Sequence, residues 1–484
     1  MKMKDLYTMT MATAMIAIAA ATSVPTESQA QEQTKRAADG GISEAMLDEI
    51  RSANQPTAAA KALFNALAES NIDDVARNHA GINSMDTYFS DETESQSITD
   101  QESSGRCWLF SGLNVIRADF AKRTDSLAVD FSQNYLFFWD QLEKANLFLQ
   151  GIIDCADKPM DDERVRFFFQ NPISDGGTFC GVADLTEKYG IVPKELMPET
   201  YASDNTRRMR AMLNSKLREQ GLQLREMAND GKTTANDLKT AKTSMLSTIY
   251  SMLSLMLGEP PVQFSYAFKN SEGRAVTAEK TYTPLEFFKD VTGVETLNGT
   301  FIMVMNDPRR EFYKTYEVEY DRHSYDGHNW RYLNLPMDDI SELAITAIRD
   351  GSKLYSSYDV GKQLDRKRGY CDTENYDYAS LFGTSFGMDK AQRIATYDSG
   401  STHAMTLTAV DLDGEGNPKK WKVENSWGAA WGQKGCLIMT HRWMEEYMFR
   451  LVVNKKYVSA KLLKLNEQEP VMVMPEDPLF SDDL

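Results

Sequence analysis

One cysteine of the chain stands where its thiol could act as a nucleophile. Cys107 comes directly after the polar segment 101–106 and begins an amphipathic run that predicts a helix over residues 107–122. The free backbone N–H groups and the positive dipole end of a helix N-terminus stabilise a thiolate. The position therefore makes Cys107 a candidate nucleophile, although a lone cysteine at a helix start is more often a small buried hydrophobe.

A candidate base and a group to orient it follow far along the chain. His403 opens an apolar run that predicts a strand over residues 405–410, and Asn425 follows the next predicted strand, residues 420–423. A hairpin of these strands brings the two side chains together, so that the Asn425 carbonyl oxygen can accept the imidazole N–H and fix its tautomer. Taken alone, a histidine beside a strand is more often a structural residue.

Taken together, these residues resemble a known family. Gln101, Cys107, His403 and Asn425 occur in the order found in papain-like cysteine peptidases, although the 296 residues from Cys107 to His403 exceed the roughly 130–150 typical of papain-like enzymes. Longer stretches closely resemble the bleomycin hydrolase and aminopeptidase C family over about residues 40–484. These stretches are QESSGRCWLFS at 101–111, FSQNYLFFWD at 131–140, DGG at 175–177, EKYGIVP at 187–193, THAMTLTAV at 402–410 and KVENSWG at 422–428.

The resemblance implies a thiol peptidase that needs no cofactor. Cys107 would attack the scissile carbonyl, His403 would move the proton, and Asn425 would hold the imidazole. The backbone N–H of Cys107 and the side-chain amide of Gln101 would bind the oxyanion, and Trp427 would cover the His403–Asn425 hydrogen bond.

The same resemblance implies how substrate is bound. Asp175, Gly176 and Gly177 would contribute to substrate binding, and a C-terminal arm, about residues 466–484, would lie in the cleft. Its terminal carboxylate at Leu484 would capture the α-amine of a peptide with a free N-terminus. Two alternatives for the arm remain open: a disordered acidic tail, or a displaced arm that leaves an endopeptidase.

The order of predicted elements indicates an α+β fold in which a helical half and a β-rich half meet at a cleft. We expect a signal peptide at 1–30, the helical half of a papain-like core at 31–204, an inserted helical and hook-like region at 205–329, and the β-rich half at 330–484. The resemblance implies a homohexamer with its active sites facing an inner cavity. A rival interpretation is a non-catalytic peptide-binding or assembly scaffold that uses the helices at 205–258 as its interface.

Local periodicity predicts further elements. We expect helices at 42–68, 134–148, 182–189 and 340–350, a helical hairpin within 205–258 that packs on its own core, and strands at 300–305, 315–320, 332–335 and 436–440.

The net charge and the N-terminal sequence limit where the protein can be located and what it can bind. The chain has 53 Lys and Arg against 71 Asp and Glu, a net charge of -18, which argues against nucleic-acid binding. A charged start, an apolar stretch at 9–21 and the small residues at 28–30 predict a cleavable signal peptide and export to a periplasm or beyond; a frayed N-terminal helix is the alternative. No later segment approaches 18 uninterrupted apolar residues, so we expect no membrane span.

The cysteines and a pair of histidines are two further groups that could carry chemistry. Five cysteines leave at least one free thiol, and the sequence does not decide whether Cys155, Cys180, Cys371 and Cys436 pair. His323 and His328 lie near Asp321 and Asp326 and suggest a metal site. The spacing lacks a helix to align the ligands, so we expect a solvated loop and no metal.

Overall fold

The computed structural model describes residues 40–80, 85–124, 127–270 and 272–480, and divides into two units, Met1–Val75 and Ala76–Leu484. The first unit contains α2 (Glu44–Ala53) and α3 (Ala58–Glu69), neither of which buries a side chain. We predicted one helix over 42–68; the chain instead breaks before Pro56, because the residue before a proline avoids the helical conformation. The predicted signal peptide lies outside the described residues.

The helical half of the second unit is built around two long, almost fully buried helices. These are α5 (Cys107–Arg123) and α6 (Gln133–Asp154), with α8 (Phe179–Tyr189) against both. Gly190 ends α8 at φ 76°, and a Cβ there would overlap the backbone of Pro284, so only glycine fits this C-cap. The predicted helices are therefore present, and α6 runs past its predicted end.

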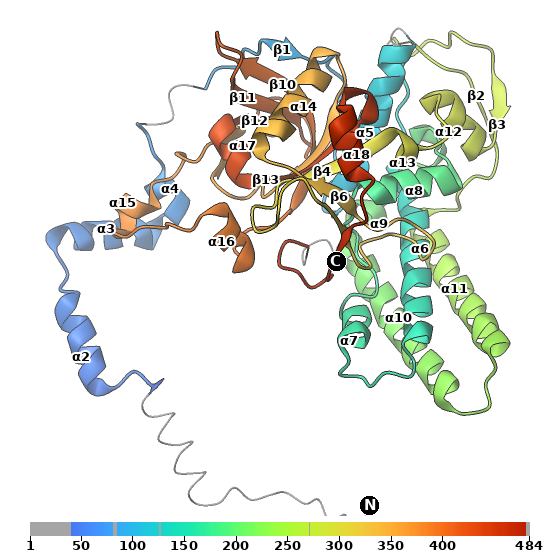
Figure 1. Cartoon of the computed structure of the whole chain (residues 1–484), viewed down its shortest axis with the longest axis horizontal. Helices are drawn as coiled ribbons and strands as arrows, with labels where there is room; N and C mark the ends of the chain where they lie inside the picture. The colour runs from blue at the N-terminus through green and yellow to red at the C-terminus, as the bar shows by residue number, and fades with distance from the viewer. Residues whose placement is uncertain (1–39, 81–84, 125–126, 271, 481–484) are drawn as a thin grey trace, which may run out of the picture. The chain divides into compact units, whose positions relative to one another are not determined.

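The predicted helical hairpin is also present and packs against α6. It consists of α10 (Thr206–Asn229) and α11 (Ala235–Leu257), which run beside α6 (Figure 1). Leu213, Leu217, Ile249 and Leu253 are buried in the same core as α5 and α6, so this face of the hairpin is interior surface.

The remaining helical elements are α4 (Ile72–Ala76), α7 (Glu163–Gln170), η2 (Lys194–Leu196), α9 (Tyr201–Asp204), α12 (Pro284–Thr292), α13 (Leu297–Thr300), α14 (Met337–Arg349), α15 (Tyr378–Phe382), α16 (Lys390–Ala395), α17 (His441–Tyr447), η3 (Lys455–Tyr457) and α18 (Ala460–Asn466).

The β-rich half is one mixed sheet with the strand order β14-β5-β6-β4-β13-β7-β10-β11-β12-β9-β8, and β1 pairs with β10. A second hydrophobic core joins this sheet to α14. Buried side chains of α14 share this core with Leu451, Trp421 and Trp443. The strands are β1 (Asp91–Glu92), β4 (Phe301–Met305), β5 (Thr315–Val318), β6 (Arg331–Asn334), β7 (Leu354–Tyr358), β8 (Leu364–Asp365), β9 (Tyr370–Cys371), β10 (His403–Leu412), β11 (Pro418–Glu424), β12 (Cys436–Thr440), β13 (Met448–Asn454) and β14 (Val471–Val473), with β2 (Phe264–Tyr266) and β3 (Lys280–Tyr282) as a separate pair.

One contact in this architecture positions the site. Helix α5 packs against β10, so the first residue of the helix lies beside the first residues of the strand. Within the described ranges, no helix is both long and apolar enough to cross a bilayer.

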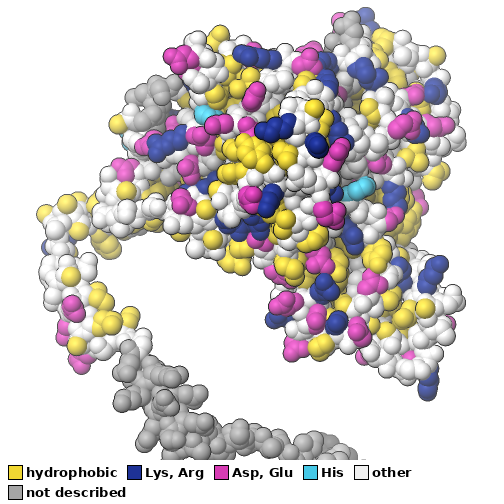
Figure 2. Space-filling view, in the orientation of Figure 1, with side chains coloured by type: hydrophobic (Ala, Val, Ile, Leu, Met, Phe, Trp, Pro, Cys, Tyr) yellow, Lys and Arg dark blue, Asp and Glu magenta, His cyan; other side chains and the backbone are white. Residues whose placement is uncertain are grey.

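Charged side chains of both signs are mixed on the surface seen in Figure 2. On the face shown in Figure 2, Lys and Arg side chains are interspersed with Asp and Glu and do not gather into one basic band.

Candidate active site

A cavity of about 330 Å³ opens where α5 meets the sheet. Its lining includes Cys107, His403 and Gln101 together with residues 174–177, so the structure gathers on one cleft most of the residues that the sequence singled out. Strands β7, β10 and β13 supply the opposite wall through Tyr355, Ala404 and Arg450.

Cys107 lies at the N-terminus of α5 with its sulfur against β10. The backbone N–H of Ala404 donates to the Cys107 Sγ at 3.5 Å, which places the thiol next to the residue that follows His403. The preceding residue, Arg106, is fully buried and pairs with Glu199 at 2.7 Å. This ion pair fixes the start of α5. The thiol is therefore fixed at a helix N-terminus, the environment that favours a thiolate.

His403 is held by Asn425, as the hairpin predicted. Its Nε2 lies 2.7 Å from Asn425 Oδ1, which also accepts the backbone N–H of Ser426. A carbonyl oxygen only accepts, so Nε2 carries the proton and Nδ1 is the basic nitrogen. The Trp427 ring lies 4.9 Å from the imidazole and covers it.

Burial keeps this imidazole neutral. It lowers the pKa of His403 to about 4, with the charge of Arg366 acting in the same direction and the Asn425 hydrogen bond opposing it. At neutral pH the ring can therefore accept a proton from a neighbouring thiol, and the resulting imidazolium is stabilised chiefly by the thiolate it creates.

Gln101 is fixed by the loop that carries Asn425. Its Oε1 accepts from Ser426 Oγ at 2.6 Å, and its Nε2 donates to the Ser104 carbonyl. The amide nitrogen is therefore on the side of the segment that leads to Cys107. Because Nε2 carries two N–H groups, one remains beyond the bond to Ser104.

Asp175 lines the cleft, but its carboxylate is occupied by the protein's own groups. It accepts the Gly105 N–H at 2.8 Å and the Thr206 hydroxyl, and it pairs with Arg210 at 2.6 Å. Burial acts to raise the pKa of Asp175, but these hydrogen bonds and the Arg210 charge hold it below its usual range. Asp175 thus joins the 174–177 segment to the loop just before Cys107.

Comparison with known proteins agrees with this geometry. Residues 41–480 match the Peptidase C1-like family. The chain belongs to this family.

Its relatives in the family are close. Aminopeptidase C of Lactobacillus delbrueckii subsp. lactis is 37% identical over 400 residues, 82% of this chain and 88% of the relative. Bleomycin hydrolase of Homo sapiens is 38% identical over 393 residues, 80% of this chain and 86% of the relative. The crystal structure of PepW from Lactobacillus rhamnosis HN001 superposes with a TM-score of 0.85 at 35% identity, covering 91% of this chain and 99% of that one. The predicted family and the papain-like α+β fold are confirmed.

The C-terminal arm of this family member packs against the sheet as far as the structure describes it. Strand β14 pairs in parallel with β5, and Asp477 pairs with Arg309 at 2.7 Å and with Arg310 at 2.6 Å. Leu479 and Phe480 are buried, and Arg450, which lines the cleft, lies over the Phe480 ring at 5.7 Å. The arm is therefore anchored up to the cleft wall; Leu484 lies outside the described residues.

The loop with two histidines differs from the prediction. His323, expected in a solvated loop, is only 2% exposed, because its Nδ1 lies 2.5 Å from Asp140 and its Nε2 accepts the Thr178 N–H. His328 bonds to Asp184 at 2.7 Å while its side chain stays 66% exposed. In the described ranges, no group of three or more His, Cys, Asp or Glu is placed to hold a metal ion.

The structure leaves all five cysteines as free thiols. Cys155, Cys180 and Cys371 are buried, and burial raises the pKa of each. Burial raises the pKa of Cys436 to about 11. Cys107 alone among them lies on the cleft with a base beside it.

Sequence reasoning missed four groups near the site. They are Lys144 and Asp140 on α6, Arg210 on α10 and Arg450 on β13. The first two stand in the FSQNYLFFWD stretch or one turn beyond it, where charged residues in an otherwise apolar helix were the available signal.

Proposed function

We propose that this protein is a cysteine aminopeptidase that removes residues from the free N-terminus of peptides. The observation that carries the proposal is the placement of Cys107 and His403 on one cleft, with Asn425 bonded to His403 Nε2 so that Nδ1 is left as the base. The names of the relatives, aminopeptidase C and bleomycin hydrolase, support the same reaction class.

The chemistry follows from the geometry. His403 Nδ1 takes the Cys107 proton, the thiolate sulfur bonds to the scissile carbonyl carbon, and the carbonyl π electrons move to oxygen. The backbone N–H of Cys107 and the second N–H of the Gln101 amide donate to this oxyanion. His403 then protonates the leaving amine as the C–N bond breaks, which leaves a thioester. Water, deprotonated by His403, attacks the thioester, and the thiol regains its proton as the acid product departs.

The arm accounts for the preference for a free N-terminus. Asp477, Leu479 and Phe480 anchor it at the cleft wall, where the Phe480 ring lies beside Arg450. A carboxylate of the arm at Leu484 would pair with the substrate α-amine, and Asp175, Gly176 and Gly177 would form the wall along which the substrate lies. An arm in the cleft leaves room for few residues on the non-primed side.

The test compares a fluorogenic aminoacyl substrate with its N-acetylated twin under reducing conditions. We expect cleavage of the free-amine substrate only, and none by Cys107→Ala. Equal cleavage of the blocked twin would show an endopeptidase with a displaced arm. Absence of Cys107-dependent cleavage across a panel of N-terminal residues would favour the non-catalytic scaffold.

Export and assembly belong to the same proposal. The pattern at residues 1–30 supports cleavage before Gln31, and N-terminal sequencing of the mature protein should begin there. The family resemblance supports a homohexamer, which sedimentation velocity of the purified protein would detect. The net charge of -18 supports the expectation that nucleic acid is not a partner.

A further inference from the structure

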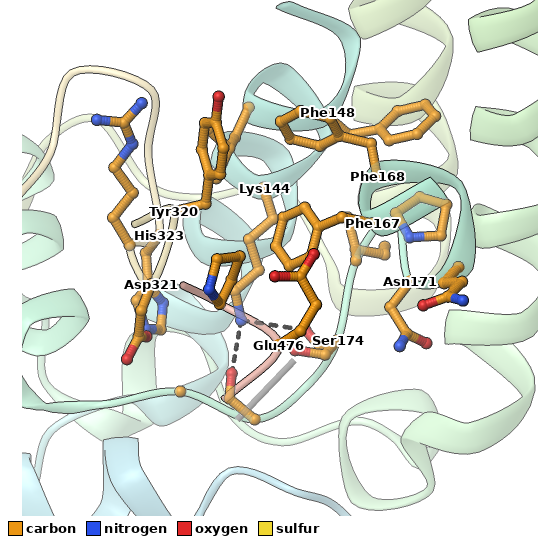
Figure 3. A pocket seen from close by; sticks show the side chains of 18 residues that line it. Lys144, Phe148, Phe167, Phe168, Asn171, Ser174, Tyr320, Asp321, His323 and Glu476 are labelled. Carbon is orange, nitrogen blue, oxygen red and sulfur yellow. Dashed lines mark hydrogen bonds between the residues drawn. The ribbon is translucent and has the colours of Figure 1, made fainter. Parts of the chain in front are cut away.

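A buried charged network lies directly behind the 174–177 wall of the cleft. Lys144 pairs with Asp140 at 3.1 Å, and Asp140 in turn bonds to His323. The Lys144 Nζ also donates to the carbonyl oxygens of Ser174 at 3.1 Å and Gly176 at 2.6 Å, the two dashed bonds in Figure 3.

The interior holds the carbonyl between these two as well. The Trp108 Nε1–H donates to the Asp175 carbonyl at 3.0 Å, and Trp108 lies against the His323 ring with 4.5 Å between centroids. Three consecutive carbonyl oxygens of the wall therefore accept hydrogen bonds from interior side chains. Through Trp108, the network also contacts the residue that follows Cys107.

Gly176 and Gly177 have no side chains with which to anchor the wall, so the hydrogen bonds to its carbonyl oxygens are needed to hold it. Gly176 and Gly177 line both the active-site cleft and a second cavity of about 230 Å³, so this segment has hollow space on two sides and carries no side chain there. The second cavity is bounded by aromatic rings such as Phe167 and Phe168, and by Pro475 and Glu476 of the C-terminal arm (Figure 3). A Cβ at Gly177 would overlap the His323 ring, so the glycine lies tightly on the network.

We propose that Lys144 is a positioning residue that fixes the Gly176–Gly177 wall for the substrate main chain, with Asp140 and His323 holding the lysine in place. This inference rests on the proposed peptidase function. The lysine touches no reacting atom; it acts through the two carbonyls that it binds.

Stability alone does not account for the network. Replacing a buried ion pair by apolar groups is often neutral or stabilising, so such a pair is weak support for a fold. Burial and the Lys144 charge lower the pKa of His323, so the ring is neutral and the Asp140 charge is matched by Lys144 alone. The Lys144 ammonium that neutralises Asp140 also donates to the carbonyl oxygens of the cleft wall.

The experiment measures kcat and KM for a free-amine aminoacyl substrate in wild type and Lys144→Met. A second variant, Asp140→Asn with Lys144→Met, removes the lysine's hydrogen bonds to the wall without leaving a buried unpaired carboxylate, while Gln141 still donates to the Ser174 carbonyl at 2.8 Å. Lys188→Met is the matched control, because Lys188 pairs with Glu143 of the same helix at 2.7 Å but makes no bond to the wall. The rate of Cys107 alkylation by iodoacetamide reports on the nucleophile independently of the wall.

We expect KM to rise about tenfold in both Lys144 variants, the loss typical of hydrogen bonds to a charged donor, while kcat changes by less than about threefold. The alkylation rate and the Lys188→Met enzyme should match wild type. An unchanged KM in the double variant overturns the proposal. A fall in kcat with slower alkylation also overturns it, because the network would then serve Cys107 through Trp108. Failure of the proposed function looks different, since wild type itself would then not cleave the substrate.

Discussion

At the scale of single residues, one oxygen atom sets the state of the base. Asn425 Oδ1 accepts from His403 Nε2 and from the Ser426 N–H, so the amide is fixed and the imidazole tautomer with it. We expect Asn425→Ala to lower kcat/KM on the order of 10²-fold, because an unheld ring populates the wrong tautomer and orientation. Steady-state kinetics would check this. A kcat/KM within twofold of wild type would mean that Trp427 and burial hold the ring without Asn425.

The thiols differ enough for a labelling prediction. Burial raises the pKa values of Cys155, Cys180 and Cys371, and that of Cys436 to about 11, so at neutral pH they are protonated and inert. Iodoacetamide at pH 7 should therefore modify Cys107 alone, as peptide mapping by mass spectrometry would show. Comparable labelling of Cys436 in the folded protein would contradict this, and the same mapping in denaturant, with all five labelled, is the control.

Asp119 offers a test of burial that is separate from catalysis. Burial raises its pKa to about 6 from 3.8, although Lys456, Lys122 and Arg123 act in the other direction. The folded state therefore binds this proton more tightly than the unfolded state, and stability is lost as the pH rises from about 4 through 6. We expect Asp119→Asn to raise the free energy of unfolding by roughly 1–3 kcal/mol at pH 7.5 and to change it little at pH 4. Urea denaturation at both pH values measures this, and an equal gain at both would assign the effect to something other than ionisation.

At the scale of elements, the anchoring of the arm makes a prediction about specificity. Asp477 pairs with Arg309 and Arg310, which also pair with the buried Asp307, and these arginines hold the pKa of Asp477 below its usual range although burial acts to raise it. We expect Asp477→Asn to loosen the arm and to raise the cleavage of N-acetylated relative to free-amine substrate about tenfold.

The control for the arm is an aspartate of similar chemistry elsewhere. Asp326 pairs with Lys188 at 2.9 Å, remote in sequence from the arm, and Asp326→Asn should leave the substrate ratio unchanged. If Asp477→Asn also leaves that ratio unchanged while lowering stability, then the ion pairs stabilise the sheet edge and do not set the position of the arm.

Elements were predictable from sequence where hydrophobic periodicity is local and strong. The helices α5 and α8 and the strand β10 follow their patterns closely. The central strand β7 has no assignment from sequence because two of its five residues, Ser356 and Ser357, are polar yet buried, bonding to Tyr358, Ser401 and the Met405 carbonyl of β10. A polar residue whose partner lies in another strand gives no local signal of a buried strand.

At the scale of the whole molecule, the same distinction separates the site from its support. Cys107, His403 and Asn425 could be found from sequence because their immediate neighbours form recognisable motifs. His323 could not be placed, because its burial depends on Asp140, 183 residues away, and on a glycine segment that closes over its ring. Local composition there, rich in Tyr, Asp and Gly, indicated solvent, and tertiary contacts decided otherwise.

The division of the chain into two units gives the last prediction. Helices α2 and α3 bury no side chain, while both large cores and the cleft belong to the second unit. A variant that begins at Asn71, and so keeps α4 and its Asn71 cap, should retain wild-type kcat/KM and a Tm within about 2 °C by calorimetry, as expected for the loss of exposed surface. Met46 and Ile50 of α2 and Phe64 of α3 are exposed, so these helices present apolar side chains that a neighbouring subunit could cover. If sedimentation then shows a smaller assembly with Tm and activity retained, residues 40–70 belong to a subunit contact; a large fall in Tm would instead mean that they stabilise the fold of the second unit.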